Sequence, residues 1–98
     1  MIANLIISQA AEELANDVES GVVVLGKKLQ FDAEGKPVCA MGHLYSRIGI
    51  NQPHRLMSGT PEAKDPIAKI VGSVVAYNEK GDTVGVVRSL RLLAQEVL

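Results

Sequence analysis

The residues in this sequence with the strongest potential for chemistry are Cys39 and His43, which lie four positions apart. On a helix this spacing places both side chains on one face, where an imidazole can serve as the base for a thiol nucleophile. A thiol at the start of a helix also lies near amide dipoles that favour the thiolate. The structural alternative is that Cys39 is a small buried hydrophobe and that Gly42 permits close packing of the helix. We favour this alternative, in which Cys39 fills space in the core.

A small-molecule pocket is a further interpretation of the same helix. Its polar lining would be Cys39, His43 and Arg47, joined by Tyr77 and Asn78 from a later junction. Apolar walls with a few convergent polar groups are typical of ligand pockets, and a nucleotide-type ligand fits this set. The competing role for Asn78 is structural, since asparagine adopts left-handed geometry or caps a preceding helix. We favour the structural role for Asn78.

Metal and cofactor chemistry have little support in the sequence. Zinc would require Cys39 and His43 together with His54 and a carboxylate such as Asp65, and this spacing matches no recognised zinc pattern. The nucleophile-elbow motif of serine hydrolases and the glycine-rich phosphate-binding motifs do not occur. We therefore expect no metal and no cofactor. A cysteine-dependent enzyme stays open as a less favoured alternative to a protein without catalytic activity.

Hydrophobic periodicity predicts the elements that must position these residues. Apolar side chains at three- and four-residue steps predict helices over 2–19, 38–48, 66–77 and 83–98. A β-branched run followed by a second short run predicts a small hairpin over 22–31. We therefore expect an α+β fold dominated by helices, in a single domain over residues 1–98.

Two helix starts have specific signals. Asp65 can cap the helix that begins at Pro66, because proline in the first turn loses no needed hydrogen-bond donor. Asp82 or Thr83 can cap the last helix. Between the second and third helices, residues 50–64 are rich in helix breakers and predict a long irregular loop, which is either functional or mobile.

Composition excludes several classes of protein. The 98 residues carry a net charge of −1, which argues against general nucleic-acid binding. A single cysteine allows no intramolecular disulfide and favours a reducing compartment. The apolar runs are too short to cross a bilayer, and the first residues lack the basic region of a signal peptide. We expect a soluble cytoplasmic protein.

Charge is distributed unevenly along the chain. Residues 1–26 contain four acidic and no basic residues, whereas residues 27–98 contain ten basic and seven acidic residues. The first helix therefore exposes an acidic face, which either meets only solvent or contacts a basic partner. A candidate interaction surface combines this face with two residues of the 50–64 loop. Its members are Glu12, Glu13, Asp17, Glu19, His54 and Arg55.

Two short motifs resemble those of a family of small uncharacterised proteins from bacteria and phages. That family has a Cys-Ala-x-Gly helix start and a Trp-Asn-Asp junction before its last helix. The matching residues here are Cys39, Ala40 and Gly42, and Tyr77, Asn78 and Glu79. Tyrosine and glutamate stand where the family has tryptophan and aspartate. The resemblance implies a shared fold, and it implies no activity because the family has no established one.

These observations favour a small non-enzymatic interaction protein, phage- or mobile-element-like, that acts by binding a host macromolecule such as a protein or complex. The scarcity of catalytic side chains is the main reason, since the acidic helix and the long loop offer contact surface instead. The alternative is a small-molecule binding or sequestering module. A homodimer is a further expectation, because a domain of this size gains stability by burying a face.

Overall fold

Four helices account for the regular structure of residues 3–98, the part of the chain that the computed structural model describes. Within these residues the only β pairing is an isolated bridge between Phe31 and Pro37. The prediction of an α+β fold is therefore wrong, and the fold is all-helical. The helices are α1 (Asn4–Glu19), α2 (Ala40–Arg47), α3 (Pro66–Lys80) and α4 (Thr83–Glu96).

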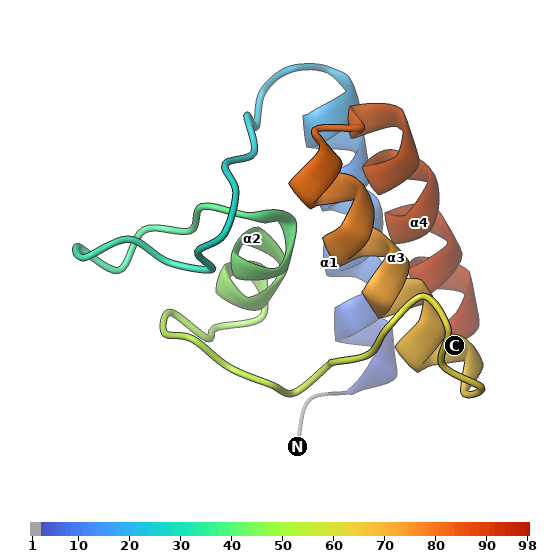
Figure 1. The fold of residues 1–98 in the computed structure, drawn as a ribbon. Helices are drawn as coiled ribbons and strands as arrows, with labels where there is room; N and C mark the ends of the chain where they lie inside the picture. The colour runs from blue at the N-terminus through green and yellow to red at the C-terminus, as the bar shows by residue number, and fades with distance from the viewer. Residues whose placement is uncertain (1–2) are drawn as a thin grey trace.

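Three long helices lie side by side, and the short α2 packs against two of them, α1 and α3, from one side (Figure 1). α4 contacts both α1 and α3, and it runs in the opposite direction to each of them (Figure 1). The core lies where the apolar faces of all four helices meet. The largest fully buried side chains are Tyr45, Leu14, Leu44, Leu90, Leu93, Val71, Val74 and Val86.

The hairpin predicted over 22–31 does not form. In its first run the Val23 amide donates to the Asp17 carbonyl of α1 at 3.1 Å, whereas its turn and its second run bond to the residues just before α2. The Gly26 amide donates to the Val38 carbonyl at 2.8 Å. The Cys39 amide donates to the Leu29 carbonyl at 3.1 Å. The residues just before α2 therefore occupy the backbone groups that a hairpin would have used.

The predicted caps of α3 and α4 are confirmed. The Asp65 side chain accepts a hydrogen bond from the Ala68 amide at 2.9 Å, with Pro66 in the first turn. The Asp82 side chain accepts one from the Gly85 amide, also at 2.9 Å. Of the two cap residues considered for the last helix, Asp82 has that role. Each bond satisfies an amide that the first helical turn leaves without a partner.

The observed ends of α2 and α3 differ from the predicted ranges. α3 continues to Lys80 and stops at Gly81, which takes the left-handed conformation with φ of 74°. Asn78 is therefore neither left-handed nor the cap of its own helix, contrary to prediction. α2 is shorter than the predicted 38–48 at both ends. The predicted start of the first helix at residue 2 lies outside the described residues.

The loop over 50–64 is fastened to the helices. The Tyr45 hydroxyl donates to the Met57 carbonyl at 2.8 Å and accepts from the Met57 amide at 3.1 Å. A Cβ at Gly72 of α3 would overlap the backbone of Thr60 and Pro61. The loop therefore lies directly on the surface of α3, where only a glycine leaves room for it.

Over residues 3–98, no helix combines the length and the apolar character needed to cross a membrane.

Candidate functional site

Asn78, one of the predicted ligand-binding residues, joins three segments of the fold. It is 5% exposed on α3. Its Oδ1 accepts a hydrogen bond from the Ala40 amide at 2.6 Å, and its Nδ2 donates to the Gly26 carbonyl at 2.9 Å. Asn78 thereby supplies a cap for the start of α2, whose own cap residue makes no side-chain bond. Its amide group is engaged in the fold on both sides.

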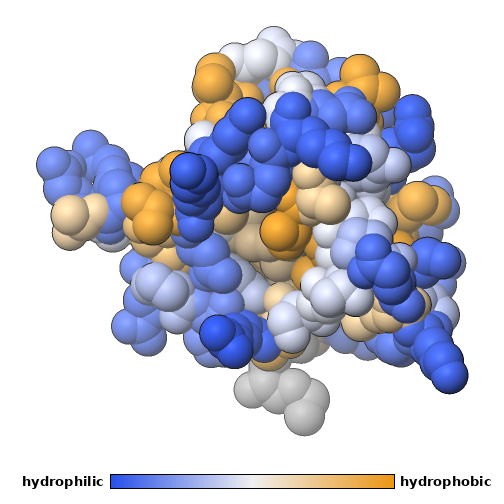
Figure 2. Space-filling view, in the orientation of Figure 1, coloured by the Kyte–Doolittle hydropathy of each residue, from blue (hydrophilic) through white to orange (hydrophobic). Residues whose placement is uncertain are grey.

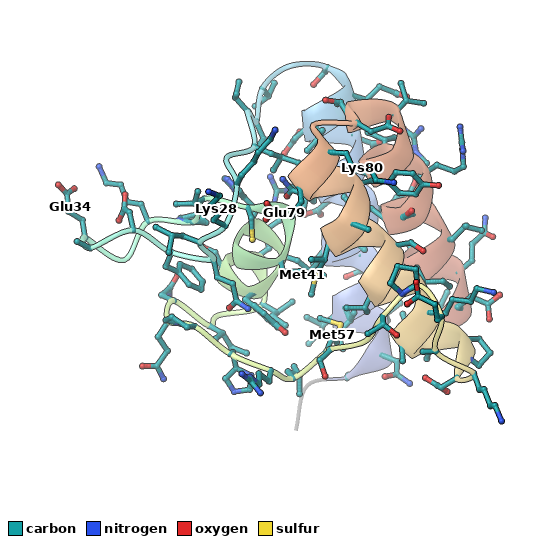
Figure 3. The ribbon with its side chains drawn as sticks, in the orientation of Figure 1. Lys28, Glu34, Met41, Met57, Glu79 and Lys80 are labelled. Carbon is teal, nitrogen blue, oxygen red and sulfur yellow. The ribbon has the colours of Figure 1, made fainter. Side chains whose placement is uncertain are left out.

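The next residue on α3 adds a second connection to the same loop. The Glu79 carboxylate accepts a hydrogen bond from the Lys28 amide at 2.8 Å, and the two residues lie next to each other in Figure 3. Lys28 has a φ of 73°, a conformation that is costly for a residue with a Cβ. The last turn of α3 therefore holds the 26–28 segment at two points.

Cys39 lies at the N-cap position of α2 and is partly buried against the core. The cavity beside it measures about 20 Å³, and Asn78 and Glu79 are among its lining residues. This volume is close to that of one water molecule. Among residues 3–98, the thiol makes no hydrogen bond to a side chain, and no group of three or more metal-ligating residues is found.

His43 and Arg47 lie four residues apart on α2 and therefore share one of its faces. Arg47 donates to the Asp17 carboxylate at 2.7 Å, and a second nitrogen lies 3.9 Å from Glu13. Burial lowers the pKa of His43 from its ordinary value of 6.5, and the Arg47 charge lowers it further. The folded protein therefore favours neutral His43.

The lowered pKa of His43 predicts a loss of stability at mildly acid pH. The unfolded chain binds a proton at His43 more readily than the folded chain does, so protonation of His43 lowers the free energy of unfolding. This loss is absent well above pH 6.5 and grows as the pH falls through 6.5 toward the lower pKa of the folded state. The free energy of unfolding, measured with urea between pH 8.0 and 5.5, should fall across this range. It should fall less steeply with pH in the variant His43→Gln. An unchanged slope in the variant would assign the decline to other groups.

Tyr77 lies on the side of α3 that faces α4. A Cβ at Gly85 would meet the Tyr77 ring at 2.5 Å, so the ring rests on the backbone of α4. The predicted pocket residues are therefore divided. Cys39 and Asn78 border the small cavity, and Tyr77 packs against α4. His43 and Arg47 lie on another face of α2, from which Arg47 contacts α1. A ligand site made by all five stays a prediction.

Another cavity, of about 260 Å³, adjoins the junction between α3 and α4. It lies between that junction and the 21–27 segment, and its lining includes Lys27, Asn78 and Thr83. A cavity therefore exists at the α3–α4 junction, as the predicted small-molecule pocket requires. Its opposite wall is formed by the 21–27 segment and not by α2.

The acidic face of α1 is paired with two arginines. Arg91 on α4 makes two hydrogen bonds to the Glu19 carboxylate, at 2.9 and 3.0 Å, and lies 3.9 Å from Glu12. The bond from Arg91 lowers the pKa of Glu19. Asp17 and Glu13 are the partners of Arg47. The four predicted surface carboxylates thus contact basic groups of the chain itself.

The remaining predicted surface residues lie in the 50–64 loop. The His54 amide donates to the Gln30 side chain at 2.9 Å, and the Gln30 side chain donates back to the His54 carbonyl at 3.1 Å. The His54 ring accepts from the Leu56 amide at 2.8 Å and meets the edge of Tyr45. Arg55 is exposed. His54 therefore helps to shape the loop, and any role in partner binding stays a prediction.

A groove on the outer side of α4 was not predicted from the sequence. It has a volume of about 460 Å³, with the nearly buried Val87 at its base and the exposed Val84 and Leu92 along its length. Val84 is 67% exposed and Leu92 44% exposed. Separate apolar residues, with hydrophilic ones between them, are visible near the right-hand edge of the molecule, where α4 lies (Figures 1 and 2). The remaining lining residues are Glu19, Thr83, Arg88, Arg91 and Gln95.

The two arginines of this groove differ in their ion pairing. Arg91 is paired with Glu19, whereas Arg88 is exposed and makes no ion pair with any carboxylate of residues 3–98. The sequence signal that was available is the spacing of Val84, Arg88 and Leu92, each four residues from the next. By its spacing Val84 also belongs to the apolar stripe that predicts a helix over 83–98, but the structure leaves its side chain exposed, so the expectation that it is buried is wrong.

Comparisons of the chain with protein-family models, with curated proteins and with solved structures found no match. The resemblance to the family from bacteria and phages therefore stays a prediction.

Proposed function

We propose that this chain is a small non-enzymatic binding protein that contacts a partner macromolecule through the groove on α4. The observation that carries the proposal is the pair of exposed apolar side chains, Val84 and Leu92, on either side of Arg88, which forms no ion pair within residues 3–98. Large apolar side chains gathered in a groove with a polar rim are typical of interaction sites on soluble proteins.

The state of the other chemistry-bearing residues supports binding over catalysis. Asn78 uses its amide to hold two backbone groups, and Arg47 is paired with carboxylates of α1. The space beside Cys39 has room for about one water molecule, which is too little for a substrate. The α4 groove is several times larger and is open to solvent.

Affinity capture with matched surface variants tests the proposal. We expect a protein from the cells that express this chain to be retained by the wild type and at least tenfold less by Leu92→Asp. The control is Leu29→Asp, because Leu29 is also exposed, at 57%, but lies in the 20–39 segment outside the groove. Substitutions at exposed positions usually change stability by about 0.5 kcal/mol or less, so both variants should melt like the wild type.

Two outcomes would contradict the proposal. One is a set of retained proteins that is the same for the wild type and both variants. The other is a partner that Leu29→Asp loses and Leu92→Asp keeps, which would place the interaction surface on the 20–39 segment.

A further inference from the structure

We infer that the α4 groove takes an amphipathic helix of a different protein, with a carboxylate near the centre of the helix's apolar face. This inference rests on the proposed function and specifies its partner. It depends on two features of the groove: the helical spacing of its apolar residues and the unpaired charge between them.

The apolar residues of the groove match the length of a short helix. Val84 and Leu92 are eight residues apart, which is about 12 Å along α4 at the helical rise per residue. Val87 lies between them and is 5% exposed, so the base of the groove is apolar as well. A partner helix covers this distance with three apolar residues, the second four positions after the first and the third seven or eight positions after it. This spacing is the usual pattern of helix-in-groove binding.

The charge at the centre of the groove selects the polar residue of the partner. Arg88 lies midway between Val84 and Leu92 in sequence and, among residues 3–98, pairs with no carboxylate. The arginines at 47 and 91 each hold carboxylates of α1. A guanidinium binds a carboxylate through charge-assisted hydrogen bonds, and a partner that covers the groove also removes water from the pair. An acidic side chain is therefore favoured opposite Arg88, and a basic one is disfavoured.

The same charge argues against a second copy of this chain as the occupant. A symmetric dimer uses the same patch on both subunits. A twofold axis at the middle of the exposed stripe would place Arg88 of one copy against Arg88 of the other. The carboxylate that lines the groove, Glu19, already binds Arg91 through two hydrogen bonds. With the axis at that point the interface would bury two like charges, and the carboxylate that lines the groove would not be free to compensate them. An axis at Leu92 would instead place Arg88 opposite the exposed Glu96 of the other copy, and the sedimentation measurement below tests that arrangement.

Two designed peptides test the inference. Both are 16-residue alanine-based helices with the same three leucines on one face. One has glutamate at the centre of that face and the other has lysine. Fluorescence anisotropy should show at least tenfold tighter binding of the glutamate peptide to the wild type at 50 mM salt. Arg88→Glu should reverse this preference, whereas Leu29→Asp should leave it unchanged.

Each result decides between the possible occupants. Equal affinities for the two peptides, no binding of either, or no effect of Arg88→Glu would overturn the inference. A dimer in sedimentation velocity that Leu92→Asp dissociates would overturn it in favour of a second copy. If capture of a cellular partner still depends on Leu92, the proposed function stands without the acidic helix. If capture also fails, both proposals are wrong.

Discussion

Replacing Asn78 with alanine is expected to lower the free energy of unfolding by about 2–4 kcal/mol, because one buried and one partly buried backbone group lose their hydrogen-bond partner at once. The Ala40 amide and the Gly26 carbonyl are the groups involved. For a domain of this size the loss corresponds to a fall in Tm of roughly 10 °C or more. Thermal and urea unfolding, each monitored by circular dichroism, measure it.

Two further variants test whether the loss of stability comes from these two hydrogen bonds. Asn78→Asp keeps an oxygen for the Ala40 amide but sets a second carboxylate oxygen against the Gly26 carbonyl and buries its charge, so we expect a loss about as large as with alanine. Asn16→Ala, which removes an exposed contact to Arg91, is the control and should change stability by less than about 1 kcal/mol. A variant Asn78→Ala as stable as the wild type would show that these bonds do not hold the fold.

Replacing Gly42 with alanine is expected to destabilise the protein by about 2 kcal/mol or more. A Cβ at this position would overlap the backbone carbonyl of Gln30, which accepts a hydrogen bond from the Val38 amide at 2.8 Å. Helix propensity favours alanine over glycine by only about 1 kcal/mol, and overpacking a close contact typically costs about 1–3 kcal/mol. A rigid backbone neighbour places the cost at the upper end of this range, so the overlap wins.

The control for this prediction is Ser46→Ala in the same helix, where a Cβ is already present. Ser46 makes one exposed hydrogen bond, to Asn51, and its loss should cost less than about 1 kcal/mol. If Gly42→Ala were as stable as Ser46→Ala, or more stable than the wild type, the 29–31 segment would have to be free to move away from α2. Hydrogen exchange at the Val38 amide, whose bond depends on Gln30, reports that movement directly.

The elements that the sequence predicted correctly are those whose signals are local. The stripe of α1 follows a regular period, and the caps at Asp65 and Asp82 lie within three residues of the amides they bind. The predicted hairpin does not form, because strand-like composition at 22–25 and 29–31 does not say which segment supplies the hydrogen-bond partner. The partner of the 29–31 run, at residues 38–39, is brought there only when α2 docks.

The candidate site was harder to predict for the same reason. The sequence places His43 and Arg47 on one predicted helix, but the carboxylates that Arg47 contacts come from another helix. The sequence of α1 predicts an acidic face, but it does not predict that Arg91, on another helix, pairs with that face. Exposure of Val84 depends on which sides of α4 are covered by α1 and α3. No period within one helix contains this information.

The bond between Asn78 and the start of α2 has a consequence for the order in which the chain folds. An eight-residue helix is too short to persist in water without tertiary contacts. Its first turn depends on a side chain 38 positions later, at the far end of α3. We therefore expect the α3–α4 hairpin to assemble before α2 does, although α2 is synthesised first, and α2 to be the first helix whose amides exchange under native conditions.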